Sequence, residues 1–317
     1  MSTGNERPLV PILTPLHAPT LAELHATYDC RNLWKGAPGQ ASLADVADRA
    51  EVVVTFSPKG IDAATIAALP KLRLVACFGV GVDAVDLEAC RARGIRVTNT
   101  PDVLTEDVAD MAMALMLATL RRIVVGDRHV REGRWLSGPL PLTTSLTRKR
   151  VGIVGLGRIG AAIASRCEAF GCTIAWHGPR PKKDVAWQYH ADPRELAAWA
   201  DVLVAACPGG PETLGIISRE VIEALGPQGV FVNIARGSVV DEPALVEALA
   251  AGRLGGAGLD VFVDEPRVPE ALFGLDSVVL APHAASGTNE TRTAMGRLVL
   301  DNVAAWFAGR PLLTPVV

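Results

Sequence analysis

The sequence predicts an α/β protein whose parallel sheets form two doubly wound domains. Short runs rich in β-branched residues alternate with alanine-rich helical stretches from one end of the chain to the other. This alternation is typical of parallel strands joined by helices. The chain has 317 residues, 49% of them hydrophobic, whereas single hydrophobic cores stop growing at about 250–300 residues. The two observations together favour two packed cores.

Four strands and three helices are expected in the first third of the chain. The predicted strands are Pro8–Leu13, Glu51–Phe56, Leu72–Phe78 and Arg96–Asn99. The predicted helices are Ser42–Ala50, Ile61–Leu69 and Asp86–Arg93. Gly94 follows the last of them and is suited to the left-handed conformation that commonly closes a helix.

The next helix is expected to begin with Thr105 as its N-terminal cap. Two acidic residues fall in its first turn and the Arg121-Arg122 pair at its end, and both placements complement the helix dipole. The following segment, Gly133–Thr147, is polar and interrupted by prolines. We interpret that segment as a linker or an arm.

A second α/β series starts at Val151. Its predicted strands are Val151–Val154, Thr173–His177, Asp201–Cys207, Gly229–Ala235, Ala257–Val261 and Ser277–Leu280. The helices between them include Arg158–Phe170 and Asp241–Ala251, the latter with Asp241 as cap and Pro243 in its first turn. A long amphipathic helix, Asn289–Phe307, ends before Gly309.

Charge and cysteine usage exclude several classes of protein. The formal net charge of −3 gives no electrostatic reason to expect a nucleic-acid partner. The six cysteines show no CxxC spacing, so neither a disulfide framework nor a zinc site is expected, and a reducing compartment is favoured. Cys77 and Cys207 lie in apolar runs and are expected to be buried.

No targeting or membrane segment is expected. The polar stretch Met1–Pro8 lacks the apolar region of a signal peptide. The apolar stretch Met111–Leu120 would extend about 15 Å as a helix, half of a bilayer core. We therefore expect a cytoplasmic protein.

A dinucleotide-binding motif follows the first strand of the second series. Gly155, Gly157 and Gly160 form GxGxxG between a predicted strand and a predicted helix. In this motif the first glycine permits a tight turn, the second lets a pyrophosphate approach the backbone, and the third allows close helix–strand packing. A glycine-rich turn without a ligand is the alternative, but the matching strand at Thr173 argues against it.

The residues after the second strand favour NADPH. An NAD enzyme usually has an acidic residue there to accept from the ribose 2′-hydroxyl. This chain reads His177-Gly178-Pro179-Arg180, followed by Lys182 and Lys183. A 2′-phosphate would meet no like charge, and Arg180 could bind it with two donors. NADH is left open, and an exposed basic loop without a ligand is the alternative.

Three more segments fall at the carboxyl ends of predicted strands, where ligands bind in open α/β sheets. They contain Arg236, Glu265 and His283. With the upstream Gly79-Val80-Gly81-Val82-Asp83 and Thr105–Asp110, they resemble the D-isomer-specific 2-hydroxyacid dehydrogenase family. Within that family the chain is most similar to NADPH-dependent glyoxylate/hydroxypyruvate reductases and their hydroxyphenylpyruvate reductase relatives. The resemblance covers essentially the whole chain.

The chemistry of these three residues suits the reduction of a 2-keto acid. Arg236 offers a fork of donors for a carboxylate and the adjacent ketone. His283 is suited to protonate the forming alkoxide, and Glu265 to hold the imidazole ring. The resemblance implies the same roles. The alternatives are a surface arginine at a helix end, an acid in a loop and a structural histidine.

The resemblance also implies further binding residues. The backbone of Val80 and Gly81 would bind the substrate carboxylate, and Trp135 would either reach the pocket of a partner subunit or serve only in packing. The implied cofactor contacts, beyond the three glycines, Arg236 and His283, are Thr105, Arg158, Ile159, His177, Gly178, Pro179, Arg180, Cys207, Pro208, Thr213, Ile234, Ala235, Asp260 and Ser286. Asp260 has the alternative of capping a turn.

The expected architecture is a Rossmann nucleotide domain, residues 100–287, inserted into a flavodoxin-like substrate domain, residues 1–99 and 288–317. A cleft between them is expected to close during hydride transfer, and the resemblance implies a homodimer. No metal is expected. Hydroxyphenylpyruvate reductase, 2-ketogluconate reductase, phosphoglycerate dehydrogenase and a nucleotide-sensing corepressor are left open. Formate dehydrogenases carry Gln where this chain has Glu265, which argues against that branch.

Overall fold

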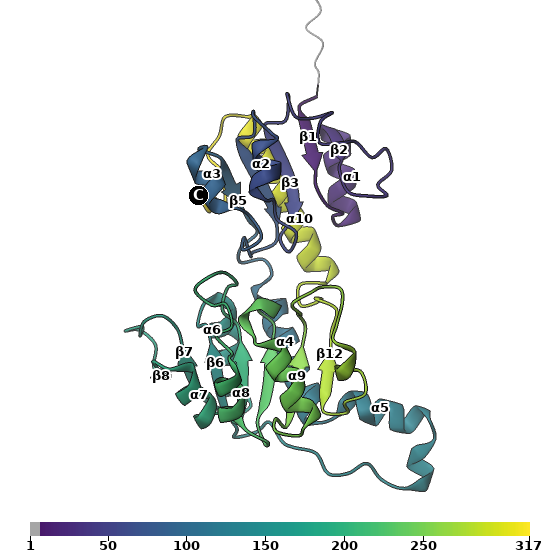
Figure 1. Ribbon diagram of the computed structural model, residues 1–317, viewed down its shortest axis with the longest axis vertical. Coiled ribbons are helices and arrows are strands. Elements are labelled where there is room, and N and C mark those ends of the chain that lie inside the picture. Colours follow the sequence, from purple (N-terminus) through teal and green to yellow (C-terminus); the bar gives the residue numbers. More distant parts are fainter. Residues whose placement is uncertain (1–6) are drawn as a thin grey trace, which may run out of the picture. The chain divides into compact units, whose positions relative to one another are not determined.

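The computed structural model describes residues 7–317 and divides into two compact units. The first unit comprises Met1–Leu104 and Thr288–Val317, and the second comprises Thr105–Gly287. Figure 1 shows the chain coloured along the sequence. The expectation that Met1–Pro8 is no signal peptide falls largely on residues 1–6, which lie outside the described residues.

The first unit contains a five-stranded parallel sheet with the order β2-β1-β3-β4-β5. Its strands are β1 (Leu9–Ile12), β2 (Asp29–Asn32), β3 (Val52–Phe56), β4 (Leu74–Phe78) and β5 (Arg96–Thr98). The chain leaves β1 in one direction to form β2 and in the other to form β3. This is the flavodoxin-like strand order, with its topological switch point between β1 and β3.

Helices cover both faces of this sheet. They are α1 (Ala18–Thr27), α2 (Ala63–Ala67), α3 (Leu87–Ala92) and α10 (Asn289–Phe307). The core on one face joins α2 and α3 to alternate residues of the strands, including Val53 and Val75. On the other face α10 contacts both β4 and α1. A Cβ on Gly296 of α10 would overlap the hydroxyl of Thr20 on α1, so the glycine permits this close helix–helix approach.

Two elements of this unit were not predicted, and one prediction was wrong. Helix α1 and strand β2 were missed. The predicted helix Ser42–Ala50 is a series of turns, although Val46 and Ala50 are buried in the core as a helix face would be. The backbone N–H and the hydroxyl of Ser42 both donate to the Asp45 carboxylate at 2.8 Å. Such side-chain bonds compete with helical hydrogen bonds.

The second unit contains a seven-stranded parallel sheet with the order β12-β11-β10-β9-β6-β7-β8. Its strands are β6 (Arg150–Val154), β7 (Thr173–His177), β8 (Gln188–His190), β9 (Val202–Ala205), β10 (Val230–Asn233), β11 (Gly256–Leu259) and β12 (Val278–Leu280). Counted from β6, this is the Rossmann order with one additional strand, and the switch point lies between β6 and β9. The predicted fold class is therefore confirmed.

Two helix layers sandwich this sheet. Helices α4 (Thr105–Leu120) and α6 (Arg158–Ala169) pack together on one face, and α7 (Pro193–Trp199), α8 (Arg219–Leu225) and α9 (Glu242–Ala250) on the other. The residues of strand β11 show why helices can pack on both faces of the sheet. Ala257 and Leu259 belong to the core under the second layer, whereas Cβ atoms on Gly256 and Gly258 would crowd Thr119 and Leu115 of α4.

The ends of α3, α6, α9 and α10 were predicted within a residue, whereas α2 is two residues shorter at each end than the predicted helix Ile61–Leu69. Asp241 caps α9 by accepting from the Ala244 backbone N–H, with proline in the first turn. Gly94 follows α3 with φ +64°. Thr105 is the first residue of α4 and not its cap. After α4 the chain forms α5 (Ile123–Arg131), which was not predicted, and the short 3₁₀ helix η1 (Arg134–Ser137) lies within the predicted arm Gly133–Thr147.

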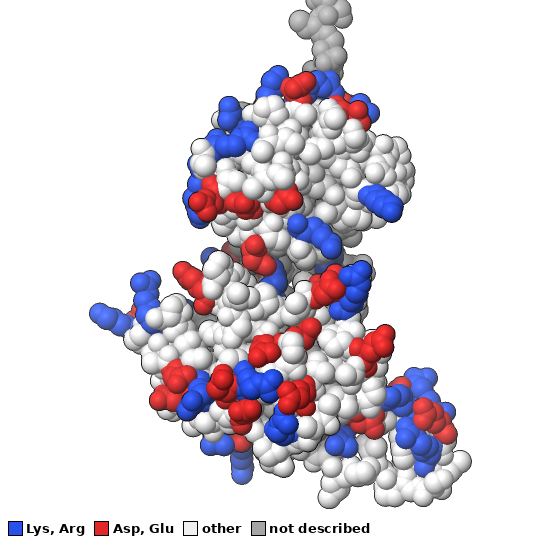
Figure 2. Space-filling model, viewed as in Figure 1, with Lys and Arg blue, Asp and Glu red and all other residues white. Residues whose placement is uncertain are grey.

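The distribution of charge and the burial of the cysteines can be compared with the sequence. Figure 2 shows lysines and arginines interspersed with acidic residues over the face in view. Cys77 and Cys207 are buried as predicted, with 1% and 7% exposure.

No helix within residues 7–317 combines the length and apolar character needed to cross a bilayer. Over the same range, no three histidine, cysteine or acidic side chains cluster in a way that would hold a metal ion.

Candidate active site

The three glycines of the dinucleotide motif meet three different constraints. Gly155 directly follows β6 and has φ +98°, and a Cβ there would overlap the backbone of Cys207. A Cβ on Gly160 would overlap the carbonyl oxygen of Gly155. Gly157 faces open space, so the position that the motif reserves for a pyrophosphate is clear of protein atoms.

The N-terminus of α6 is suited to bind an anion. Gly157 is the N-cap residue of this 12-residue helix and supplies no capping side chain. The N–H groups of the first turn therefore remain available, and the helix dipole favours negative charge beside them. Arg158 and Ile159, two of the implied cofactor contacts, are the first residues of the helix.

The carboxyl end of β7 presents basic and not acidic side chains. The Nδ1 atom of the buried His177 ring lies 3.1 Å from the carbonyl oxygen of His190, and because a carbonyl only accepts, Nδ1 is the donor. This bond joins β7 to β8. The hydroxyl of Tyr189 donates to the carbonyl of Gly178 at 3.0 Å. Pro179 and Arg180 then follow at the surface.

Lys182 was not among the candidate residues, yet it contacts the glycine loop. Its ammonium group donates to the carbonyl oxygen of Leu156 and lies 6.0 Å from the ring centroid of Trp176, within range of a cation–π interaction. The run of cations after Pro179 was the available signal. Which cation turns back over the loop depends on the path of the chain after β7.

The loop after β9 lies against the glycine loop. Burial raises the pKa of Cys207 to about 11, so its thiol stays protonated near neutral pH. The hydroxyl of Thr213 donates to the carbonyl of Pro208 at 2.6 Å. Thr213 and Pro208, which the resemblance implies as cofactor contacts, are thus bonded to each other. Because the backbone of Cys207 lies against Gly155, their loop lies at the carboxyl edge of the sheet, beside the switch point between β6 and β9.

Arg236 is held by a turn at the end of β10. The Asn233 side chain donates to the carbonyl of Arg236 at 2.9 Å and accepts from the backbone N–H of Ala235 at 3.0 Å. The guanidinium group donates to the carbonyl of Ala235 at 2.8 Å. A Cβ on Gly237 would overlap the backbone of Phe262, so this turn packs directly on the loop that leads to Glu265.

Glu265 and His283 form the central pair of the site. The Nδ1 atom of His283 lies 2.7 Å from Oε2 of Glu265, and the backbone N–H of Phe262 donates to Oε1 at 3.1 Å. Burial alone would raise the pKa of Glu265, but His283, the Phe262 N–H and the charge of Arg236 together lower it. Because the ionised carboxylate only accepts, Nδ1 carries a proton and Nε2 is left to face a ligand.

Asp260 determines the turn that carries His283. The Asp260 side chain is fully buried, and its carboxylate accepts from the backbone N–H groups of Ala284 at 2.7 Å and Ala285 at 2.9 Å. The backbone N–H of His283 donates to the Asp260 carbonyl at 2.8 Å. His283 itself has φ +51°, which is uncommon outside glycine. Burial is also the main reason that the pKa of Asp260 is raised.

In the first unit, the loop after β4 contains Val80 and Gly81, the residues expected to bind the substrate carboxylate. Gly79 has φ +143°, and a Cβ there would overlap Ser57. The Ser57 hydroxyl donates to the carbonyl of Gly81, and the Asn99 side chain donates to that of Val80 at 2.8 Å. The backbone N–H groups of Val80 and Gly81 have no acceptor among the described residues. Ser57 and Asn99 were not predicted.

The remaining candidates lie at several places in the second unit. Ile234 and Ala235 are buried behind Arg236, with 7% and 6% exposure, and Ser286 is half-buried after His283. Trp135 lies apart from these loops in η1, with 65% of its surface exposed. The structure thus brings Arg236, Asp260, Glu265 and His283 together and leaves Trp135 on the arm.

Comparisons with known proteins decide the family. The family described as D-isomer specific 2-hydroxyacid dehydrogenase, NAD binding domain, matches residues 113–285. A hydroxyphenylpyruvate reductase of Plectranthus scutellarioides is 53% identical over 306 residues, covering 96% of this chain and 98% of the relative. The chain belongs to the D-isomer-specific 2-hydroxyacid dehydrogenase family. The family predicted from the motifs is therefore confirmed.

Two further members of the 2-hydroxyacid dehydrogenase family are similar over nearly the full chain. A glyoxylate/hydroxypyruvate reductase of Arabidopsis thaliana is 49% identical, covering 96% of this chain and 98% of the relative. The crystal structure of an NADPH-dependent glyoxylate/hydroxypyruvate reductase from Sinorhizobium meliloti, in complex with NADP and malonate, is 42% identical with a TM-score of 0.92, covering 98% of this chain and 97% of that chain. This dehydrogenase is an oxidoreductase with an NAD(P)-binding domain.

Proposed function

We propose that this dehydrogenase uses NADPH in preference to NADH to reduce a small 2-keto acid of the glyoxylate or hydroxypyruvate type to the D-2-hydroxy acid. The 2.7 Å contact between His283 and Glu265 carries the proposal. It couples a titratable imidazole to an ionised carboxylate beside Arg236, and this is the arrangement that a reaction generating an alkoxide requires.

The proposed mechanism assigns one task to each residue of the site. Arg236 binds the carboxylate and the ketone oxygen, which orients the carbonyl and stabilises the charge that develops on its oxygen. His283 in its protonated form donates from Nε2 to that oxygen. NADPH, when bound at the glycine loop of Gly155, Gly157 and Gly160, would supply the hydride for the keto carbon. The sum of one hydride and one proton converts the ketone to a hydroxyl group, and His283 regains its proton from solvent.

Glu265 and Asp260 act through His283. The Glu265 carboxylate fixes the imidazole ring by its bond to Nδ1 and leaves Nε2 for the ketone oxygen. Asp260 holds the left-handed turn that aims the ring. The first unit would serve as the substrate domain, with the N–H groups of Val80 and Gly81 binding the substrate carboxylate, and the second as the nucleotide domain.

The preference for NADPH rests on the charges near the glycine loop. The end of β7 has no carboxylate to accept from a ribose 2′-hydroxyl, Arg180 lies at the surface just beyond it, and the ammonium group of Lys182 contacts the loop itself. A 2′-phosphate would gain charge-assisted hydrogen bonds from these cations. The similar enzyme from Sinorhizobium meliloti is NADPH-dependent and was crystallised with NADP.

We further propose that the protein is a cytoplasmic homodimer that uses α5 and the arm Gly133–Thr147 as its interface. Large apolar side chains are exposed along these two segments, among them Val130 (55%), Trp135 (65%), Leu136 (96%) and Leu142 (101%). Burial of such side chains against a second subunit is favourable. Equilibrium sedimentation tests the proposal, and a Leu136→Glu variant that stays dimeric would argue against this interface.

Steady-state assays with a panel of keto acids test the proposed reaction. Glyoxylate, hydroxypyruvate, hydroxyphenylpyruvate and 2-ketogluconate are each combined with NADPH and with NADH, and the product is resolved by chiral chromatography. We expect D products and a kcat/KM at least about tenfold higher with NADPH, since one charge-assisted contact is worth that much or more. Failure to oxidise NADPH with any 2-keto acid would contradict the proposal and favour a nucleotide-sensing role.

A further inference from the structure

The loop after β4 is held by one of its carbonyl groups, and this determines where one of its N–H groups points. The Asn99 side chain donates from Nδ2 to the carbonyl oxygen of Val80 at 2.8 Å. In a trans peptide unit, the carbonyl of one residue and the N–H of the next lie in one plane and point in opposite directions. The bond from Asn99 therefore fixes the direction of the Gly81 N–H, one of the two donors proposed for the substrate carboxylate.

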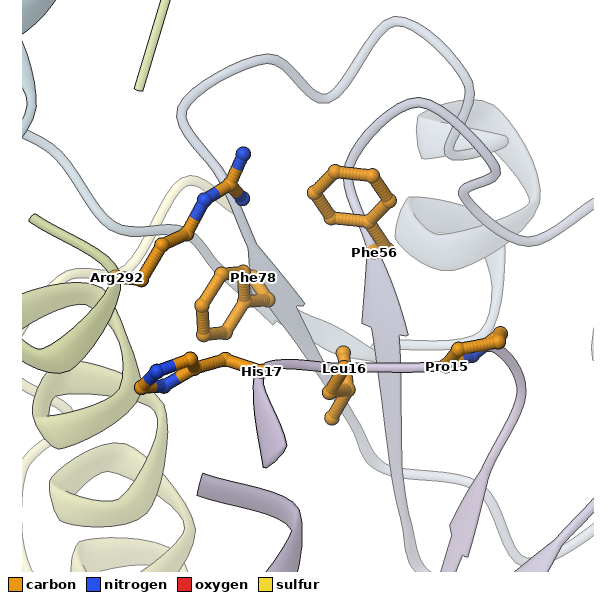
Figure 3. A pocket seen from close by; sticks show the side chains of 6 residues that line it. All are labelled: Pro15, Leu16, His17, Phe56, Phe78 and Arg292. Atoms are coloured by element: carbon orange, nitrogen blue, oxygen red, sulfur yellow. The ribbon is translucent and has the colours of Figure 1, made fainter. Parts of the chain in front are cut away.

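The loop begins beside a pocket of about 280 Å³ in the same unit. Phe56 and Phe78, which line this pocket together with Arg292, directly precede Ser57 and Gly79. Figure 3 shows the Arg292 side chain extending from α10 toward both rings. Its guanidinium carbon lies 5.5 Å from the ring centroid of Phe56 and 5.7 Å from that of Phe78. A small anion thus has room next to the loop, and the direction of the N–H groups decides whether the loop binds it.

Asn99 is held in turn by residues 311–317, the segment that follows α10. Asn99 directly follows β5, the last strand in the sheet order. Its backbone N–H donates to the carbonyl oxygen of Thr314 at 3.3 Å, and the Thr314 hydroxyl donates to the carbonyl oxygen of Asn99 at 2.6 Å. A single residue that lies 215 positions later in the chain therefore engages both backbone polar groups of Asn99.

The rest of the segment 311–317 pairs with β5. The Val316 N–H donates to the carbonyl of Val97 at 2.7 Å, and the Val97 N–H donates to the carbonyl of Val317 at 3.3 Å. The Nε atom of Arg96 also donates to the Val317 carbonyl, at 2.8 Å. Because the open side of an edge strand presents N–H and carbonyl groups that need partners, this pairing orders the strand that carries Asn99.

Asn302 joins the segment 311–317 to α10. Its side chain is 1% exposed. Its Nδ2 donates to the hydroxyl oxygen of Thr314 at 2.9 Å and to the carbonyl of Leu298 at 2.8 Å, and its Oδ1 accepts from the N–H groups of Leu313 at 2.9 Å and Thr314 at 3.3 Å. The hydroxyl that accepts from Asn302 has one proton to donate, and this proton goes to Asn99. A buried network in which each member is satisfied holds a single conformation.

We infer that Thr314 is a positioning residue for the substrate carboxylate. It acts through Asn99 on the carbonyl of Val80, and hence on the direction of the Gly81 N–H. Without the Thr314 hydroxyl the Asn99 carbonyl loses its donor, so the Asn99 side chain is less well placed and the Val80–Gly81 peptide unit can rotate. This inference rests on the proposed function, because it takes the substrate carboxylate to bind at Val80 and Gly81.

A substitution that removes only the hydroxyl tests this inference. Thr314→Val replaces the hydroxyl with a methyl group, and Thr314→Ser keeps the hydroxyl. The matched control is Thr27→Val, because the Thr27 hydroxyl donates to a carbonyl of its own helix α1, that of Glu23 at 2.9 Å. Three quantities are measured: the steady-state constants for the best keto acid of the panel, the inhibition constant of oxamate, a carboxylate that is not reduced, and the affinity for NADPH by fluorescence titration.

We expect Thr314→Val to raise KM for the keto acid and the inhibition constant of oxamate about threefold or more, the effect of one neutral hydrogen bond. The change in kcat should be smaller, because the contact is made in the ground state as well as in the transition state. The affinity for NADPH should stay at the wild-type value. Thr314→Ser should restore both constants, and Thr27→Val should leave them unchanged.

A double variant tests whether Thr314 acts through Asn99. Asn99→Ala removes the donor to the Val80 carbonyl and should itself raise KM and the inhibition constant of oxamate. Adding Thr314→Val to Asn99→Ala should raise them no further, since residues that act through one contact have non-additive effects. If Thr314→Val has the same effect with and without the Asn99 side chain, the two residues act independently and the inference is wrong.

The remaining outcomes separate this inference from the proposed function. A wild-type enzyme that oxidises NADPH with none of the keto acids would refute the proposed function itself. If the wild-type enzyme is active and Thr314→Val lowers only the melting temperature, with KM and oxamate inhibition unchanged, the hydroxyl serves stability alone and the inference is overturned. Should Thr314→Val not fold, Thr314→Ala removes the same hydroxyl with a smaller side chain and is measured in its place.

Discussion

The Nδ1 atom of His283 lies 2.7 Å from Oε2 of Glu265, although the two residues lie on separate loops, one after β11 and one after β12. The contact exists because each loop is held independently. The Phe262 N–H holds the other oxygen of Glu265, and Asp260 holds the turn that contains His283. Chemistry at this site therefore depends on residues that do not themselves touch a substrate.

Replacement of the two residues that contact the keto acid should have different kinetic effects. We expect His283→Ala to lower kcat about 10²–10⁴-fold with little change in KM, because proton donation occurs only in the transition state. Arg236→Ala should lower kcat and raise KM, since the guanidinium binds the carboxylate in the ground state as well. Steady-state kinetics with glyoxylate distinguish the two. An undiminished His283→Ala enzyme would remove the assigned acid.

The charge of Glu265 should contribute to turnover through His283. In Glu265→Gln the amide oxygen can still accept from Nδ1, but the negative charge that faces the ring is lost. We expect kcat with glyoxylate to fall about tenfold or more, while the affinity for NADPH, measured by fluorescence titration, stays near the wild-type value. An unchanged kcat would mean that the carboxylate charge has no part in the reaction.

The same carboxylate should contribute to stability in a pH-dependent way. The pKa of Glu265 is lowered in the folded protein, so its contribution is fully present above the pKa of an unfolded glutamate, about 4.3. It is lost as the pH falls through the lowered folded value. The melting temperature of the wild type should therefore exceed that of Glu265→Gln more at pH 7 than at pH 3.5. A constant difference would contradict the lowered pKa.

Asp260 is expected to act as a positioning residue. Asp260→Ala removes the acceptors for the Ala284 and Ala285 N–H groups, so the left-handed turn at His283 should relax. We expect kcat to fall about tenfold or more while NADPH binding, measured by fluorescence titration, changes far less. Asp260→Asn keeps one acceptor and should restore part of kcat. A merely structural role would instead lower stability and binding together, without this partial rescue.

Two glycines of the motif should respond differently to alanine. Gly160→Ala places a methyl group against the Gly155 carbonyl, so we expect a loss of about 1–3 kcal/mol in the free energy of unfolding. Gly157→Ala faces open space and should keep the stability of the fold while weakening NADPH binding. Chemical denaturation and fluorescence titration measure both quantities. Equal stabilities for the two variants would contradict the packing role of Gly160.

Most of the second unit could be predicted because its signals are local. The strand, GxGxxG and helix occur within twenty residues of one another, and the end of each parallel strand can be placed on one edge of the sheet from sequence alone. For that reason the sequence predicts Arg236, Glu265 and His283 as one site. Their order along the chain also identified the family, which the comparisons confirm.

Strand β2 shows why the first unit was harder to predict. Asp29, Cys30, Arg31 and Asn32 form an edge strand that, within residues 7–317, pairs only with β1. They lack the alternation of polar and apolar residues that marks a half-buried strand. Without β2, the switch point between β1 and β3 cannot be recognised from the sequence. The pocket with Arg292 was missed as well, because Arg292 follows Phe78 by more than two hundred residues and meets it only through the packing of α10 on β4.

The sequence by itself therefore determined the fold class, the dinucleotide motif and the identity of the three central side chains, since each depends on residue types at short spacing. Only the tertiary structure decided which side chains support them. Asp260 holds the turn of His283, Lys182 contacts the glycine loop, and Arg292 is left stacked on two aromatic rings. These contacts join segments that are distant along the chain, and the distance between such segments is set by the packing of helices on sheets, which no local pattern records.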